Sequence, residues 1–512
     1  MIVLMTYLVT LSLIGAWIMG MTYPEHREGF QKWVLGWCVF IISACVFSIP
    51  FILLLSVVLY VNHLKIDQPY LKAATYFATF ASMPAGMSWT VPGPPGINFI
   101  LNVSVNMMLL ICLFGPTIYQ DLWVKKKPWV TDQYDRYFVA TILITVLLPF
   151  FRFDSLTGIL RYGVNYFLNY VLLFFFVSRY VTRFEHIRKC LIALCMGALI
   201  VSLMAALEQQ KYWYLYPSLQ WSLGMGNPTY GIFYLTRAGL LRTQVTTGHP
   251  IALGIFMVIA CVAAVYFWDT RHHTKKRLNS LFHLSVIGMF LLGVFNSVSK
   301  GAFLGTIVAL AVYGHERIAR GAIRRLIKIG TVMLVLMIWF GPDLSSFTAS
   351  SSGNETVLSD TGSYTYRSQL IETSIGVILK NPIFGSFDYY NDPDMEIMRQ
   401  GQGIIDITNT YLLVALDHGL VGLTLFLLLL IKPQWALYRL LRRRKNPLPP
   451  NIRAMAALLL ASLFSLAVMI ATVSRMGILP YLTLMLIGLS IAFIRNVDSW
   501  LEEPREEANQ TS

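Results

Sequence analysis

Apolar runs of about 20 residues recur from one end of the chain to the other, and polar segments separate them. That length allows a helix to cross the hydrocarbon core of a bilayer. The pattern predicts an all-α polytopic membrane protein with about 14 transmembrane helices. The predicted spans are residues 1–20, 34–61, 73–91, 96–119, 137–152, 163–181, 190–207, 250–268, 280–296, 301–313, 329–341, 408–431, 454–472 and 477–494.

Two of these runs are unusual. The second is long and contains Pro50, so a short re-entrant pair is an alternative there, which gives about 15 helices. The first, Met1–Gly20, has neither a basic start nor small residues suited to a cleavage site, so we expect a retained helix.

One polar stretch, residues 342–407, is far longer than the other interruptions. Its first part, 345–362, is too rich in Ser, Thr, Gly and Asn to cross a bilayer. Apolar residues then recur at helical spacing over Tyr364–Leu379 until an Asn-Pro pair ends the pattern, which predicts an amphipathic surface helix carrying Arg367. Irregular backbone is tolerated outside lipid, so we expect one large extracytoplasmic loop with short amphipathic helices.

The chain accordingly divides into five regions. They are N-terminal transmembrane helices (1–207), further transmembrane helices with an outer loop and a turn (208–341), the large loop (342–407), C-terminal transmembrane helices (408–494) and a short cytoplasmic tail (495–512).

The positive charge of the chain gives the expected topology. The net charge is +14 at pH 7, and five connecting loops hold 23 of the 40 Lys and Arg residues. Basic loops stay on the cytoplasmic side, so this charge indicates membrane topology and contact with acidic membrane lipids, and no nucleic-acid partner. The five loops are 120–136, 182–189, 269–279, 314–328 and 432–453.

Basic residues on the outer side run against this bias. Each needs a separate explanation, which is either function or a solvated side chain. There are ten of them: Arg152, Arg161, Lys211, Arg237, Arg242, Lys300, Arg367, Lys380, Arg399 and Arg475.

The first of three candidate constellations is Arg242–Pro250, which closes an outer loop. Arg242 offers a planar, permanently charged donor for phosphate oxygens, and Arg237 lies five residues before it. His249 titrates near neutral pH and directly precedes a proline suited to a helix start. The alternative is a capped helix start in which the histidine is hydrogen-bonded to a neighbour.

The second constellation is the tight turn Asn296–Gly301 between two apolar helices. It presents backbone N–H groups, Ser299 and Lys300 at a helix N-terminus, an arrangement that binds anions. The alternative is a hairpin turn whose polar residues are simply solvated.

The third constellation lies where the large loop returns to the membrane. Asp406 carries a carboxylate suited to act as a base, and Asn409 follows it. His418 falls about two turns into the next apolar run. The alternatives are a helix N-cap for Asp406 and a packed core residue for His418.

Together these motifs resemble the O-antigen ligase and polymerase superfamily of membrane glycosyltransferases. The resemblance covers residues 235–425, while the N-terminal half matches only in being helical and membrane-bound. It rests on Arg242 before Gly248 and Pro250, on the Ser-Val-Ser-Lys-Gly turn 297–301, on Pro382–Gly385, on the Asn-Thr-Tyr-Leu run 409–412 and on the Gly-Leu-Val-Gly run 419–422.

Two positions depart from the family pattern. Lys300 stands where the family usually has Arg, which keeps the charge and loses the bidentate fork. Thr408 stands where ligases often place a His before the Asn, which removes the base that those enzymes favour and argues against the ligase assignment.

The resemblance implies a GT-C-like fold and glycan transfer from polyprenyl-pyrophosphate carriers at the outer face of the bacterial cytoplasmic membrane. We predict an inverting polymerase of lipid-linked oligosaccharide repeat units, which makes O-antigen, capsule or exopolysaccharide. Pyrophosphate is a good leaving group, so cations that stabilise its developing charge are the main requirement. The predicted residues are Arg242, Arg367, Lys300, Arg237, Ser299 and Asn409 for substrate binding, and Asp406, then His249, for catalysis.

We expect no cofactor and no metal, because no Asp-x-Asp motif lies near these positions and the six cysteines lie in apolar runs without metal-ligand spacing. Possible partner proteins are a chain-length regulator and a flippase. A ligase that transfers the glycan to a lipid A core acceptor is the alternative within the class. A flippase or transporter is the alternative of another class, which the large loop and the lack of an internal repeat disfavour.

Overall fold

The computed structural model describes residues 2–46, 50–82, 88–94, 98–148, 155–222, 234–237, 239–271, 277–317, 360–399, 403–444 and 447–510. Helices account for most of them. The helices are α1 (Ile2–Thr22), α2 (Arg27–Val46), α3 (Pro50–Leu64), α4 (Pro69–Thr79), α5 (Val105–Tyr119), α6 (Gln133–Leu147), α7 (Leu156–Tyr166), α8 (Leu172–Tyr180), α9 (Phe184–Lys211), α10 (Leu215–Ser222), α11 (Pro250–Thr270), α12 (Arg277–Asn296), α13 (Lys300–Arg317), α15 (Asp360–Lys380), α16 (Thr410–Leu441), α17 (Pro450–Ile470) and α18 (Leu479–Gln510). The strands are β1 (Ser88–Pro92), β2 (Phe99–Ser104), β3 (Thr236–Arg237) and β4 (Leu240–Leu241).

Eight helical segments within the described residues are long and apolar enough to cross a membrane, which confirms the all-α polytopic class. The number of about 14 helices stays a prediction, as does the division into five regions. The predicted span 329–341 and residues 342–359 of the predicted large loop lie outside the described residues. The eight segments are Ile2–Thr22, Val105–Val124, Leu156–Tyr180, Phe184–Lys211, Pro250–Thr270, Thr410–Leu441, Pro450–Ile470 and Leu479–Glu502.

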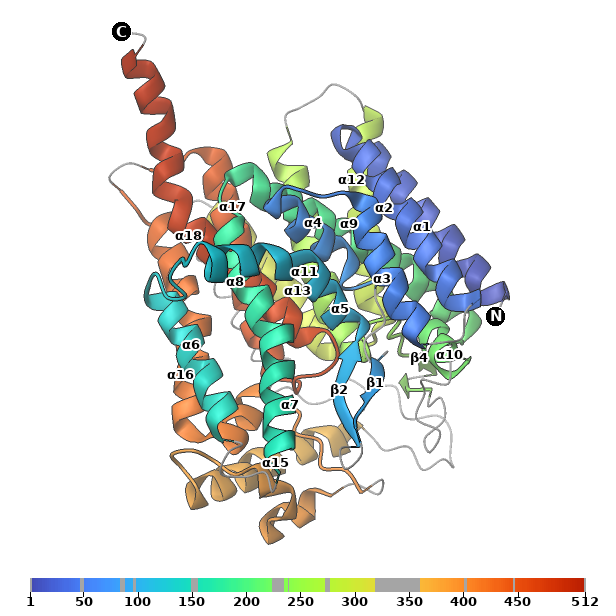
Figure 1. Cartoon of the computed structure of the whole chain (residues 1–512), viewed down its shortest axis with the longest axis vertical. Coiled ribbons are helices and arrows are strands. Elements are labelled where there is room, and N and C mark those ends of the chain that lie inside the picture. Colours follow the sequence, from blue (N-terminus) through green and yellow to red (C-terminus); the bar gives the residue numbers. More distant parts are fainter. Residues whose placement is uncertain are drawn as a thin grey trace.

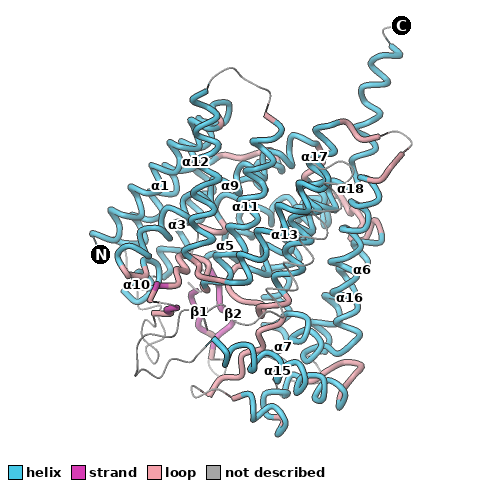
Figure 2. The backbone as a smooth tube through the Cα atoms, turned by 180° about the vertical axis from the view of Figure 1, so that it is seen from behind, coloured by secondary structure: helices cyan, strands magenta, loops and turns pink. Residues whose placement is uncertain are grey.

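The long helices lie side by side. In Figure 1, α9, α11 and α13 run through the middle, α1, α2 and α3 lie along one side, and α6 and α16 lie along the other. α15 lies at the lower end. Figure 2 shows from behind that β1 and β2 also lie towards the end occupied by α15.

The predicted helices over 73–91 and 96–119 are wrong in part. α4 ends at Thr79, α5 begins only at Val105, and β1 and β2 form an antiparallel hairpin between them. Residues on β2 alternate between half-buried and exposed at its start, which is the period of a strand. The prolines in this region cannot continue a helix, because they lack an N–H donor.

The single helix predicted over 34–61 is also replaced by two helices. α2 ends at Val46 and α3 begins at Pro50, a residue whose fixed φ suits the first turn of a helix. The break agrees with the alternative of a pair of helical segments.

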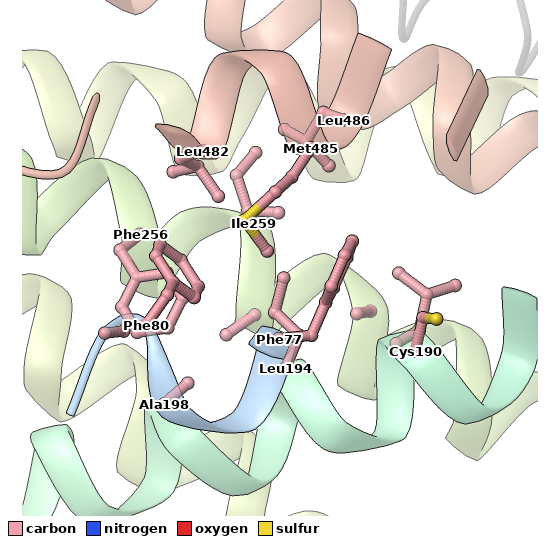
Figure 3. Close-up of a cluster of buried hydrophobic side chains, with 14 of the residues drawn as sticks. Phe77, Phe80, Cys190, Leu194, Ala198, Phe256, Ile259, Leu482, Met485 and Leu486 are labelled. Carbon is pink, nitrogen blue, oxygen red and sulfur yellow. The ribbon is translucent and has the colours of Figure 1, made fainter. Parts of the chain in front are cut away.

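The apolar core lies where α4, α9, α11 and α18 meet (Figure 3). Gly197 on α9 permits the closest approach, because a Cβ there would lie 2.4 Å from the carbonyl oxygen of Ala78 on α4. Four of the described cysteines are buried and free, as expected for small core residues. The side chains labelled in Figure 3 are Phe77, Phe80, Cys190, Leu194, Ala198, Phe256, Ile259, Leu482, Met485 and Leu486.

The helix predicted over Tyr364–Leu379 is confirmed as α15. One row of its apolar side chains packs against Tyr389, Met395, Met398 and Ile405, which form a small core of their own. A second row is exposed: Ile371, Ile375 and Leu379. The described part of the predicted large loop therefore folds around a hydrophobic cluster of its own.

Candidate active site

The segment Arg242–Pro250 runs from β4 to the first turn of α11 as a fixed loop. The carboxylate of Glu208, which is fully buried near the end of α9, accepts hydrogen bonds from the backbone N–H groups of Gln244 and Val245 at 3.2 and 3.0 Å. The hydroxyl of Tyr214 donates to the carbonyl of Arg242 at 2.8 Å. These bonds satisfy backbone groups that no helix or strand satisfies here, so they hold the segment in place.

The turn Asn296–Gly301 is bonded directly to this segment. The backbone N–H and the hydroxyl of Thr243 both donate to the carbonyl of Asn296, at 3.1 and 3.0 Å. The guanidinium of Arg237 donates to the carbonyl of Val298 at 3.5 Å. The first two predicted constellations are therefore one structural unit.

The alternative of a fully solvated turn is wrong. The side chains of Asn296, Ser297 and Ser299 are buried, and Val298 adopts a left-handed φ of 44°. The side chain of Ser299 is buried, which makes the predicted substrate contact a poor fit. Its backbone carbonyl accepts hydrogen bonds from the first N–H groups of α13. Lys300, the first residue of α13, is exposed.

The third constellation joins α15 to the start of α16. The hydroxyl of Tyr366 donates to the carbonyl of Asp406 at 3.0 Å. Arg367, the next residue along α15, is exposed. The side-chain oxygen of Asn409 accepts from the N–H groups of Tyr411 and Leu412, so Asn409 is the N-cap of α16 and Asp406 is not. The carboxylate of Asp406 is thus not used for capping, and only the amide nitrogen of Asn409 is suited to a further contact.

Two glycines join the Pro382–Gly385 segment to α16. Gly419 has φ 65° and ψ −167° within α16, and a Cβ there would lie 2.3 Å from the carbonyl oxygen of Ile383. A Cβ on Gly385 would lie 2.3 Å from the carbonyl oxygen of Leu416. The N–H of Leu420 donates to the carbonyl of Pro382 at 2.8 Å. Two family-like motifs 37 residues apart therefore touch through their backbones.

The α17–α18 connection touches all three constellations. A Cβ on Gly477 would lie 1.8 Å from the carbonyl oxygen of Thr247, and the neighbouring Ile478 N–H donates to the same oxygen at 3.3 Å. The hydroxyl of Thr410 at the start of α16 donates to the carbonyl of Val473 at 2.6 Å. Gly301 of the second constellation packs against this connection as well. The connection therefore fixes the relative positions of motifs from distant parts of the chain.

Arg237 and Arg367 both lie close enough to Arg242 at this junction for their charges to act on it. Burial and the charges of Arg237 and Arg367 lower the pKa of Arg242 to about 10, which leaves it charged at neutral pH. The Nε of Arg242 is buried and has no hydrogen-bond partner among the described residues. Nor does any carboxylate within the described ranges form an ion pair with Arg237 or Arg242. A cluster of cations held together in this way is suited to an anion of high charge.

His249 sits beside this cluster. Its Nδ1 accepts a hydrogen bond from the N–H of Ile251 at 3.2 Å and caps α11, so the capped helix start is what the structure shows. Burial and the charge of Arg242 lower the pKa of His249 to about 4, so the ring is neutral at pH 7. With Nδ1 as acceptor the proton of the neutral ring lies on Nε2. His249 is therefore suited to donate a hydrogen bond and poorly suited to the predicted role of base.

Asp406 is better suited to that role. Burial raises the pKa of Asp406, and the nearby charge of Arg367 opposes this rise. A carboxylate with a raised pKa is a stronger base than one in water, and the cation beside it favours the ionised form. His418, the other titratable residue singled out in the sequence, is buried within α16, as the packed alternative requires.

The basic residues that the charge pattern predicts on the outer side separate into two groups. Arg161 donates to the carbonyls of Phe99 and Ile100, and Lys380 and Arg399 form ion pairs with acidic neighbours, so all three have structural partners. Arg152 lies outside the described residues. The second group consists of Arg237, Arg242 and Arg367, whose charges act on one another. Lys300 is exposed, two residues after the Val298 carbonyl that Arg237 contacts.

Arg475 was not among the predicted site residues. It lies on the α17–α18 connection and pairs with Asp417 of α16 at 3.3 Å. Its place among the ten outer basic residues was the signal for it, but no motif surrounds it. The partner stands 58 residues away, so the pairing depends on tertiary structure.

Among the described residues, no three His, Cys, Asp or Glu side chains gather into a group that could hold a metal ion.

Residues 284–427 match a protein-family model described as O-antigen ligase. The matched segment contains the second constellation, α15 and the start of α16, while Arg237, Arg242 and His249 precede it and reach it through the Thr243–Asn296 bonds. No match to the chain is found among curated proteins.

Proposed function

The O-antigen ligase match over residues 284–427 confirms the resemblance drawn from the motifs, and from that premise we propose that the chain polymerises polyprenyl-pyrophosphate-linked oligosaccharide repeat units. The observation that carries the proposal is the cluster of Arg237, Arg242 and Arg367 beside Asp406. We place this site at the outer face of the bacterial cytoplasmic membrane, where the lipid carrier presents its pyrophosphate. The product is O-antigen, capsule or exopolysaccharide.

The proposed reaction is a single displacement at the donor sugar. The hydroxyl oxygen of the acceptor glycan attacks the anomeric carbon and forms the new glycosidic bond. The bond between that carbon and the pyrophosphate oxygen breaks, and its electron pair leaves with the lipid pyrophosphate. Asp406 takes the hydroxyl proton, and the anomeric configuration inverts.

The cations act on the leaving group in this proposal. Negative charge grows on the bridging oxygen of the pyrophosphate as its bond to the sugar breaks, and Arg242 and Arg367 stabilise that charge. Arg237 and Lys300 add positive charge at the edge of the cluster. The Nε2–H of His249 and the amide nitrogen of Asn409 supply hydrogen bonds to the donor, so no metal ion is required.

The ligase alternative has one observation in its favour, which is the description of the matching family. Thr408 favours the polymerase, because the histidine that ligases often place there is missing. The two activities differ in acceptor: the polymerase joins one lipid-linked glycan to another, and the ligase transfers the glycan to a lipid A core.

Purified protein incubated with one polyprenyl-pyrophosphate-linked repeat unit and EDTA is expected to give a ladder of products that differ by one repeat. The ladder would support both the polymerase and metal independence. Transfer that appears only after a lipid A core acceptor is added would instead establish the ligase. If neither product forms and vesicles containing the protein translocate the labelled lipid, the glycosyltransferase proposal is wrong and the flippase alternative holds.

Asp406→Asn is expected to slow transfer by about 10²- to 10⁴-fold at neutral pH, because the amide cannot accept the hydroxyl proton. In the unmodified protein the rate should fall as the pH drops through the raised pKa of Asp406. Arg367→Gln should shift this acid limb to higher pH, because the Arg367 charge now lowers that pKa. Initial rates across the acid range measure both effects. A full rate for Asp406→Asn would exclude Asp406 as the base.

A further inference from the structure

A polar cavity of about 290 Å³ opens where the start of α4 meets the ends of α5 and α8. The connection that follows α5 belongs to the basic loop 120–136, which the charge pattern assigns to the cytoplasmic side. In Figure 1, α6 runs from this region towards α15. The cavity therefore lies away from the arginine cluster and plays no part in the proposed transfer.

Three lysine ammonium groups line this cavity. Lys72 donates to the hydroxyl of Thr117 at 3.0 Å. Lys125 and Lys127 approach the two carboxylate oxygens of Asp121 at 3.0 and 2.6 Å, and both lysine side chains are more than half exposed. An ammonium group has three N–H donors, so each lysine has donors beyond the bond just named.

The carboxylate of Asp121 positions these lysines. It is 6% exposed and receives hydrogen bonds from both lysines and from the hydroxyl of Tyr180 at 2.9 Å. With Asp67 as the second acid, the cavity lining carries three positive and two negative side chains. The excess is positive, and a buried acid already satisfied by three donors offers little repulsion to an incoming anion.

A second cavity of about 260 Å³ adjoins the first and shares Lys127 with it. Its lining includes the apolar side chains of Ile118, Leu122 and Phe175. Tyr119 and Trp123 stand exposed at the end of the candidate span Val105–Val124. Exposed aromatic side chains at the end of a transmembrane helix mark the depth of the lipid headgroups.

We propose that the paired cavities bind an anionic phospholipid, with its phosphate against Lys72, Lys125 and Lys127 and the start of an acyl chain along the apolar cavity. The lysines match the charge of the phosphate, and the aromatic residues place the cavities at headgroup depth. Inorganic phosphate would satisfy the lysines, but it would leave the apolar cavity without a ligand. An anionic lipid therefore fits both cavities.

Native mass spectrometry of the full-length protein in detergent tests the proposal, with phosphatidylglycerol and phosphatidylcholine of identical acyl chains as probes. We expect tighter binding of phosphatidylglycerol, and Lys72→Gln should weaken it about fivefold. Lys127→Gln is a second variant and should do the same. Lys126→Gln is the matched control, because this lysine has the same charge and lies between two lining lysines, but it does not line the cavity.

Equal binding of the two lipids, or equal losses for Lys72→Gln and Lys126→Gln, would overturn the proposal. Competition by inorganic phosphate distinguishes the two possible sources of the anion. If inorganic phosphate displaces the lipid at equal concentration, the site recognises free phosphate and the lipid assignment is wrong. If it does not, the acyl chain contributes to binding as proposed.

Discussion

Arg242→Ala is expected to lower the rate of glycan transfer by about 10²- to 10³-fold, while the protein remains in the membrane at its normal level. A loss of this size is typical when an enzyme loses one hydrogen-bond donor to the negative charge that develops in the transition state. Stability should not fall, because burial and the charges of Arg237 and Arg367 disfavour the charged form of Arg242 in the folded protein and lower its pKa. The backbone carbonyl of Arg242, which receives the Tyr214 hydroxyl, is kept in the variant.

The matched control for this variant is Lys211→Ala. Lys211 is an exposed basic residue at the end of α9, so its removal changes the net charge equally and leaves the cluster intact. Arg242→Lys should recover only part of the rate, because an ammonium group keeps the charge but cannot bind two oxygens in the fork geometry. Transfer by Arg242→Ala at the rate of Lys211→Ala would exclude Arg242 from the site. Transfer rates normalised to membrane protein make the comparison.

The sequence predicted those parts of the structure that have a strong local signal. Apolar run length predicted α1, α11 and α17 closely and the central part of α9, and helical spacing predicted α15. The β1–β2 hairpin was missed because its alternating residues are apolar enough to extend the neighbouring runs. Hydropathy does not distinguish a short strand from part of a helix.

The candidate site was predicted as three separate motifs, and the structure explains how they meet. Arg242, His249 and Asp406 were found because their residue types stand at the ends of apolar runs. The contacts that bring them together were not predictable, since they depend on Gly477 against Thr247 and on Arg475 with Asp417. Local patterns carry no information about which outer loops touch. The protonation of His249 also follows from its hydrogen bond to Ile251, which only the structure supplies.

Gly419→Ala should reduce stability and transfer together, because two separate effects act at this position. Its φ of 65° with ψ of −167° is a backbone conformation reserved for glycine, and costs about 1–3 kcal/mol for other residues. The new Cβ would also lie 2.3 Å from the carbonyl oxygen of Ile383, so one backbone must move. We expect a total loss of about 3 kcal/mol or more in the free energy of unfolding. The displaced segment includes Asp417, so the Arg475 pair should be disturbed as well.

Gly403→Ala separates the two effects. Gly403 has a φ of 76°, and a Cβ there would meet nothing within 4 Å. This variant should therefore show only the backbone cost of about 1–2 kcal/mol and keep most of its transfer activity. Thermal unfolding in detergent and the ladder assay measure both variants side by side. Equal losses would mean that the contact between Gly419 and Ile383 contributes nothing, and that the two motifs are not held together through it. A much larger loss for Gly419→Ala would show that the contact between Gly419 and Ile383 holds the start of α16 in place, including Asp417 and its pair with Arg475.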